Sequence, residues 1–85
     1  MASYSLDVRK SAAKEIAALP KRECAAIVAK IRGLGNEPRP HGAEKLSGDD
    51  KYRVRHGDYR VVYEIDDAKK RVTIVRVAHR REVYR

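Results

Sequence analysis

The sequence predicts an α+β fold: a small antiparallel sheet of about four strands, mixed at most, backed by a helical hairpin near the N-terminus. Two patterns lead to this prediction. Apolar residues recur at helical spacing through residues 10–34, and they alternate with polar residues through residues 52–78, as they do in half-buried strands. A chain of 85 residues has room for one hydrophobic core, so residues 1–85 are expected to form a single domain.

The N-terminal segment predicts a strand followed by a first helix. Residues 4–8, with the sequence YSLDV, alternate between apolar and polar side chains, which is typical of a short half-buried strand. Beyond it Ala12, Ile16 and Leu19 recur three or four positions apart, and this spacing predicts a helix. Pro20 should stop that helix, because proline cannot donate the next helical hydrogen bond.

A second helix is predicted to begin at Pro20, since proline suits the first position of a helix. Its apolar stripe has helical spacing and contains Cys24, Ile27, Val28, Ile31 and Leu34. Gly35 and Asn36 then offer residues that tolerate the left-handed conformation at a helix end. The two helices should pack as an antiparallel hairpin behind the sheet, with Cys24 as a buried structural thiol.

Residues 36–50 predict a loop, because they contain two prolines, two glycines and no periodicity. Loops of this length are uncommon in a small domain unless they serve a site. Arg39, His41 and Lys45 are therefore candidates for outer contacts with a partner. The alternative is that the segment is only a solvated connection.

Residues 52–65 carry the most regular strand pattern. Two alternating runs, 52–56 and 59–65, flank a Gly57-Asp58 turn and predict a β-hairpin. Residues 72–78 predict a third strand.

The alternation gives the hairpin an apolar, aromatic face and a basic face. Tyr59 and Tyr63 share the parity of the valines, so we expect them in the core. Arg53, Arg55 and Arg60 share the opposite parity and should emerge together on the other face.

In the third strand the alternation assigns Val75 and Val77 to one parity, and Arg76 and Arg80 to the other. Glu64 has the parity of the basic face and is expected to pair with a neighbouring arginine.

The net charge of +8 is concentrated in the C-terminal part of the chain. Residues 51–85 contain eleven Lys and Arg against five Asp and Glu, whereas residues 1–50 contain nine against seven. A basic field of this kind attracts polyanions and makes their binding sensitive to salt. Clustering on one half, with tyrosines interleaved, favours a phosphate-rich partner over a surface that is merely solubilising.

Several chemistries have no support in the sequence. The chain lacks a Gly-rich phosphate loop and a hydrolase motif, and His41, His56, His79 and Cys24 are widely separated, so neither a metal nor a cofactor is expected. No apolar run is long enough to span a bilayer and residues 1–5 do not resemble a secretion signal, which indicates a cytoplasmic protein with no membrane partner.

Guanidinium groups are well suited to phosphodiester chemistry. They are permanently charged, they bind phosphate oxygens as a bidentate fork, and they offset the extra negative charge of a phosphorane transition state. Metal-free RNA cleavage needs such cations, a base for the attacking 2′-hydroxyl and an acid for the leaving 5′-oxygen.

Three segments resemble the RelE branch of the RelE/ParE toxin superfamily: KLSG at 45–48, YRVRHGDYRVVYEI at 52–65, and VAHRREVY at 77–84. The resemblance implies a RelE-like fold and a toxin of a type II toxin–antitoxin system. It further implies a metal-independent, ribosome-dependent endoribonuclease, an mRNA interferase, that cuts messenger RNA in the decoding site. The implied partners are mRNA, the ribosome and a RelB-like antitoxin that binds the toxin in a hetero-oligomer.

The resemblance also implies five catalytic residues. Arg53 and Arg55 match basic positions of the first hairpin strand, which are lysines in the best-known RelE proteins. Arg60 matches the arginine expected to hold the scissile phosphate, and Arg80 matches the arginine after the last strand. Tyr84 matches a C-terminal tyrosine that stacks on a base or assists proton transfer.

The arginines at two lysine positions change the expected chemistry. A lysine with a lowered pKa can act as a base, whereas an arginine, with a pKa above about 12, cannot. Arg53 and Arg55 are therefore expected to stabilise charge, which leaves Tyr84, a water or a ribosomal group as the base. His79 is a candidate acid or base, because histidine titrates near neutral pH. Its parity, opposite to that of Arg80, favours the alternative of a strand-end side chain.

Weaker outer contacts with RNA are expected from Arg39, Lys45, Lys51, Arg76 and Arg81. Two other functions remain open on the same scaffold: a ParE-like poison of DNA gyrase that acts by binding, and a catalytically degenerate member that binds only nucleic acid or its antitoxin.

Overall fold

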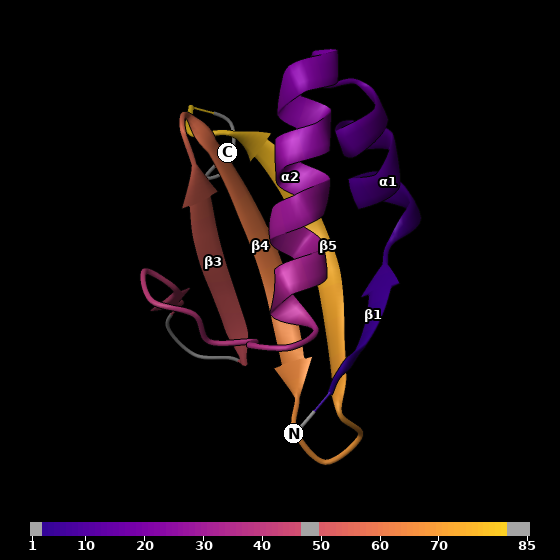
Figure 1. Cartoon of the computed structure of the whole chain (residues 1–85), viewed down its shortest axis with the longest axis vertical. Helices are drawn as coiled ribbons and strands as arrows, with labels where there is room; N and C mark the ends of the chain where they lie inside the picture. Colours follow the sequence, from indigo (N-terminus) through magenta and orange to yellow (C-terminus); the bar gives the residue numbers. More distant parts are fainter. Residues whose placement is uncertain (1–2, 47–49, 82–85) are drawn as a thin grey trace.

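The computed structural model describes residues 3–46 and 50–81, and these form a five-stranded sheet with two helices on one face (Figure 1). In chain order the elements are β1 (Ser5–Val8), α1 (Lys10–Ala17), α2 (Lys21–Leu34), β2 (Glu44–Lys45), β3 (Lys51–His56), β4 (Tyr59–Asp66) and β5 (Arg71–His79). The predicted α+β class, the two helices and the three long strands are confirmed.

The sheet is mixed, with the order β1-β5-β4-β3-β2. β1 runs parallel to β5, and all other neighbours are antiparallel. The prediction of about four strands missed β2, which lies in the segment 36–50 that was expected to be a loop. Because β2 pairs only Glu44 with Arg53 and Lys45 with Tyr52, it is too short to produce an alternating pattern.

A β-bulge interrupts the pairing of β4 with β5. Val62 lies opposite Arg76, but Tyr63 lies opposite Ile74, so Val75 is an extra residue on β5. The prediction that Val75 and Val77 share one parity is therefore wrong: Ile74 is buried before the bulge, and Val77 is buried after it. The bulge follows from the pairing of two strands, and β5 contains no glycine or other local signal for it.

The core lies between the helices and the sheet. Its buried helical side chains are Ala12, Ile27, Ile31 and Leu34. These pack against buried residues of β3, β4 and β5, namely Val54, Val61, Tyr63, Ile65, Val72, Ile74 and Val77. Cys24, which was expected to be buried, is only partly buried because it lies in the first turn of α2, beyond the stripe that meets the sheet.

Gly35 follows α2 for a different reason from the one expected. Its φ is −67°, so the chain does not adopt the left-handed conformation there. The N–H of Tyr4 donates to the Gly35 carbonyl oxygen at 2.7 Å, and a Cβ on Gly35 would lie 3.2 Å from the carbonyl oxygen of Tyr4. The glycine therefore permits close approach of the N-terminal segment to the end of α2.

Candidate nucleic-acid interface

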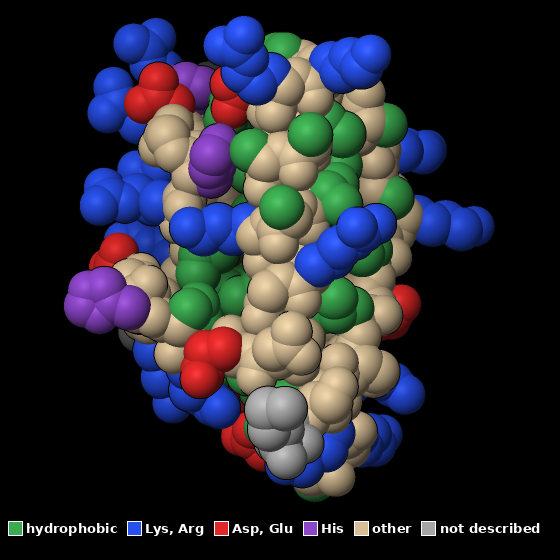
Figure 2. All heavy atoms as spheres, viewed as in Figure 1, with side chains coloured by type: hydrophobic (Ala, Val, Ile, Leu, Met, Phe, Trp, Pro, Cys, Tyr) green, Lys and Arg blue, Asp and Glu red, His purple; other side chains and the backbone are tan. Residues whose placement is uncertain are grey.

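The helices leave one face of the sheet open, and the cross-strand register assigns the arginines to that face. Arg55 lies directly opposite Arg60, and Arg53 lies opposite Val62, whereas the intervening Val54 is buried under the helices. Figure 2, viewed from the helix side, shows Lys and Arg side chains projecting past the margin where β3 lies, with apolar side chains between β3 and α2.

Four arginines gather at the end of this face that is next to the β3–β4 turn, and we call Arg53, Arg55, Arg60 and Arg80 the arginine cluster. Partial burial lowers the pKa of Arg60, and the positive charges of Arg55, Arg53 and Arg80 lower it further. Asp58 acts in the opposite direction. The fold thus holds like charges close together, an arrangement that a bound anion would stabilise.

The β3–β4 turn anchors Arg60. Its Nη1 donates to the carbonyl oxygens of Gly57, at 3.3 Å, and Tyr59, at 3.2 Å. Gly57 has a φ of +57°, a conformation that favours glycine. Arg53 is held from the neighbouring strand, where its Nη2 lies 3.1 Å from a carboxylate oxygen of Glu44.

Of the two side chains that are candidates for proton transfer, Tyr84 lies outside the described residues and His79 lies within them. His79 is half-buried on the helix side, where its ring meets the edge of Tyr59 with centroids 5.8 Å apart and its Nδ1 accepts the Arg81 N–H at 3.3 Å. His79 therefore lies away from the arginine cluster, as its parity indicated.

The predicted outer contacts are dispersed. Lys51 lies on the open face opposite Glu64, and Arg76 lies there opposite Val62. Lys45 pairs with Tyr52 and shares its helix-side parity, and Arg81 is exposed after β5.

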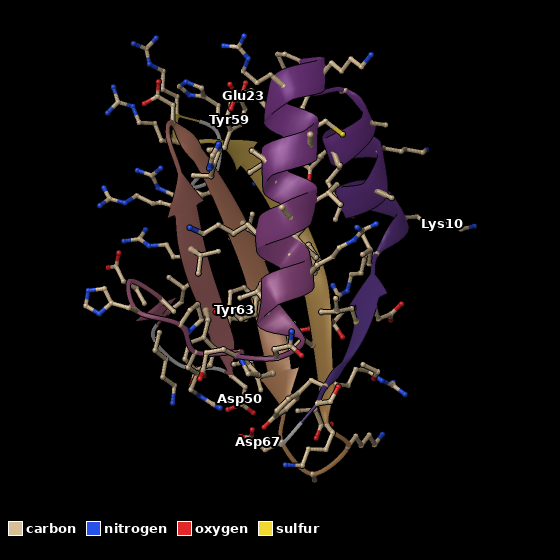
Figure 3. The ribbon with its side chains drawn as sticks, in the orientation of Figure 1. Lys10, Glu23, Asp50, Tyr59, Tyr63 and Asp67 are labelled. Atoms are coloured by element: carbon tan, nitrogen blue, oxygen red, sulfur yellow. The ribbon has the colours of Figure 1, made fainter. Side chains whose placement is uncertain are left out.

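Arg39 belongs to a different cluster, at the other end of the sheet. Its Nη2 lies 2.9 Å from a carboxylate oxygen of Asp67, and its Nε donates to the Tyr52 hydroxyl at 3.1 Å. The hydroxyl of Tyr4 donates to Asp67 at 2.6 Å. Figure 3 shows Asp67 at the opposite end of the sheet from Tyr59. Arg39 thus joins the N-terminal segment, the 36–50 segment and the β4–β5 turn.

We expect Asp67→Asn to flatten the acid-unfolding profile. Hydrogen bonds from Arg39 and then from Tyr4 lower the pKa of Asp67 from 3.8 to about 2. A carboxyl group with a lowered pKa stabilises the folded state above its unfolded pKa, and that contribution is lost as the pH falls towards 2. Urea unfolding at pH 7, 4, 3 and 2 measures this. Asp7→Asn, an exposed change of the same kind on β1, is the control and should behave like the wild type.

Sequence reasoning missed Glu15, which protects the edge of β5. After Ile74, β5 no longer has β1 as its neighbour, and there Glu15 Oε1 accepts the N–H of Val77 at 2.9 Å. The other carboxylate oxygen lies 3.5 Å from Arg76 Nε. A lone glutamate on a helix gives no sequence signal for such a contact.

Glu64 does pair with an arginine, as expected, but the partner is Arg9, at 3.1 Å. Arg9 directly follows β1, and β1 lies beside β5 in the sheet.

Across residues 3–46 and 50–81, no three His, Cys, Asp or Glu side chains are placed to hold a metal ion. In the same residues no helix has the length and apolar character needed to cross a membrane.

Solved structures show which class of protein has this arrangement of helices and sheet. The archaeal RelE–RelB complex from Pyrococcus horikoshii matches with a TM-score of 0.81 and 29% identity over 95% of this chain and 99% of that chain. The toxin–antitoxin complex RelBE2 from Mycobacterium tuberculosis matches with a TM-score of 0.80 and 31% identity over 91% of this chain and 98% of that one. The fold is that of the RelE toxins.

Sequence comparison extends this likeness to the family. Residues 6–84 match the family described as ParE toxin of type II toxin-antitoxin system, parDE. Toxin RelE of M. tuberculosis is 39% identical over 96% of this chain and 87% of its own length, and Toxin RelG of that organism is 36% identical over 96% and 97%. The chain therefore belongs to the RelE/ParE family of toxins from type II toxin–antitoxin systems.

Proposed function

We propose that this toxin is a metal-independent, ribosome-dependent endoribonuclease that cleaves mRNA in the decoding site and thereby inhibits translation in the cytoplasm. The observation that carries the proposal is the arginine cluster on the open face of the sheet. The fold brings four permanent positive charges together there, and, after partial burial, the charges of Arg55, Arg53 and Arg80 lower the pKa of Arg60. A phosphodiester approaching a second anionic charge in its transition state is a ligand that would offset this repulsion.

The spacing of the cluster suits the RNA backbone. Residues two apart on one strand lie about 6.7 Å from each other, so Arg53 and Arg55 can contact neighbouring phosphates. Arg60, directly across from Arg55, can share one of them as a bidentate ligand. Cleavage would proceed by attack of the 2′-oxygen on the adjacent phosphorus and departure of the 5′-oxygen. The arginines would stabilise the phosphorane, while the proton acceptor would be another group, with Tyr84 among the candidates.

We propose a RelB-like antitoxin as the protein partner, in a hetero-oligomer. Two solved structures with this fold are complexes of RelE with RelB or of a RelBE pair. A chain with a net charge of +8 and a cluster of repelling arginines would be stabilised by acidic segments of such a partner.

The test is cleavage by the purified toxin of an mRNA on programmed ribosomes. We expect cuts within the codon in the ribosomal A site and no cuts in the same mRNA without ribosomes. Normal translation in the presence of abundant folded toxin would contradict the proposal.

The second candidate is a ParE-like poison of DNA gyrase, favoured by the family description that residues 6–84 match. Inhibition of gyrase supercoiling together with intact mRNA would establish it in place of the nuclease. Tight binding to programmed ribosomes without either effect would instead identify a catalytically degenerate member of the family.

A further inference from the structure

Arg80 lies beyond the last residue of β5, so strand pairing does not hold it in the arginine cluster. Within residues 3–46 and 50–81, its hydrogen bond and its ion pair both come from Asp58 in the β3–β4 turn. The backbone N–H of Arg80 donates to the Asp58 carbonyl oxygen at 2.7 Å, and its Nε lies 3.8 Å from Asp58 Oδ1. One residue thus contacts both the backbone and the guanidinium of Arg80.

The side-chain pair contributes orientation more than stability. The side chains of Arg80 and Asp58 are 56% and 64% exposed, and exposed ion pairs add little to the free energy of unfolding. An arginine whose Nε faces a carboxylate still presents its two terminal nitrogens as an end-on fork for phosphate oxygens. The pair can therefore bias the direction in which that fork points.

The carboxylate of Asp58 also interacts electrostatically with the cluster. It raises the pKa of Arg60, whereas Arg80 lowers it. Glu44, a second carboxylate that contacts the cluster, is hydrogen-bonded to Arg53 at the β2 edge. Asp58 is thus placed to offset the repulsion between Arg60 and Arg80 in the absence of RNA.

We infer that Asp58 is a positioning residue for cleavage: it holds Arg80 beside Arg60, ready to bind the transition state, without itself touching RNA. The inference rests on the proposed nuclease function. It has a distinctive consequence, because Asp58 is an anion and must repel the phosphate that the arginines attract. Removing its charge should tighten ground-state binding of RNA while slowing the reaction.

The experiment compares Asp58→Asn, Arg80→Ala and the double variant with the wild type on programmed ribosomes. The Kd is measured with an mRNA carrying a 2′-deoxy nucleotide at the cleavage position, and the rate is measured in single turnover. We expect Asp58→Asn to bind as tightly as the wild type or more tightly, and to cleave about 2-fold to 5-fold more slowly, since an exposed ion pair can bias the orientation of Arg80 only by its own small interaction free energy. The double variant should be no slower than Arg80→Ala, since Asp58 acts through Arg80.

Asp7→Asn removes the same charge from an exposed residue of β1 and should leave cleavage unchanged. A direct readout of positioning is the ¹⁵N relaxation of the Arg80 Nε–H, which should show greater mobility in Asp58→Asn. Unchanged mobility, a wild-type cleavage rate, or additive losses in the double variant would each overturn the assignment. A purely structural role would instead weaken binding and cleavage together and lower Tm. If the wild type fails to cleave, the proposed function is wrong, and the relaxation measurement still decides whether Asp58 positions Arg80.

Discussion

Arg60→Ala is expected to reduce the rate of mRNA cleavage by roughly 10²-fold to 10³-fold, the loss seen when one preorganised transition-state donor is removed. Arg60 is the member of the arginine cluster that lies directly across from Arg55 and is anchored to the turn by two carbonyl oxygens. Its guanidinium is thus preorganised, and the alanine variant lacks this bidentate donor to the phosphorane. Arg60→Lys keeps the charge but loses the bidentate geometry, so an intermediate rate is expected.

The stability of Arg60→Ala should not fall with its activity. Arg60 repels Arg55, Arg53 and Arg80 in the folded state, and its removal relieves this repulsion. We expect a Tm equal to or above that of the wild type, measured together with growth arrest on controlled expression. Lys10→Ala is the control: Lys10 is exposed on α1 and projects away from the sheet, so it should remain toxic (Figure 3). A fully toxic Arg60→Ala protein would show that the open face is not the active face.

Tyr63→Ala is expected to destabilise the domain by about 3–5 kcal/mol. Tyr63 is fully buried, its ring stacks on Tyr52 with centroids 6.0 Å apart, and its hydroxyl donates to the Pro38 carbonyl oxygen at 2.6 Å. A domain of this length has a total stability of roughly 4–13 kcal/mol, so the variant should lose a large fraction of it and unfold at a much lower Tm. Urea unfolding followed by circular dichroism measures the change.

Tyr63→Phe isolates the hydroxyl group. The Pro38 carbonyl oxygen would lose its buried donor, at a cost of about 1–3 kcal/mol. Tyr59→Phe is the matched control, since the Tyr59 hydroxyl forms no hydrogen bond with residues 3–46 or 50–81, and it should change stability little. Equal losses in the two variants would contradict the assignment of the buried hydrogen bond.

The same hydroxyl should make the fold sensitive to alkali. Burial raises the pKa of Tyr63 from 10.0 to about 12. Between these values the unfolded chain releases the proton while the folded chain retains it, so stability falls as the pH rises. Tyr63 contributes a slope of about 1.4 kcal/mol per pH unit, and the slope should be smaller by that amount in Tyr63→Phe when both proteins are unfolded in urea at pH 9, 10, 11 and 12.

The alternation of the hairpin was sufficient to assign Arg53, Arg55 and Arg60 to one face and Tyr63 to the other, because strand parity is a local property. It was not sufficient for β5, where the extra residue at Val75 reverses the parity without a local signal. The alternation also could not assign a role to Arg39, because its partners Asp67 and Tyr52 are distant in sequence. In the sequence, a loop arginine with a structural role looks the same as one available to RNA.

The sequence by itself determined the fold class, both helices, the basic face and the family, because periodicity, charge and motif spacing are carried by the order of residues alone. Only the tertiary structure decided the parallel pairing of β1 with β5, the existence of the two-residue β2 and the bulge in β5, since these depend on pairing between distant segments. It alone brought Asp58 to Arg80, because the end of β5 meets the β3–β4 turn only after the sheet has formed. Which group orients each arginine is therefore a property of the assembled sheet.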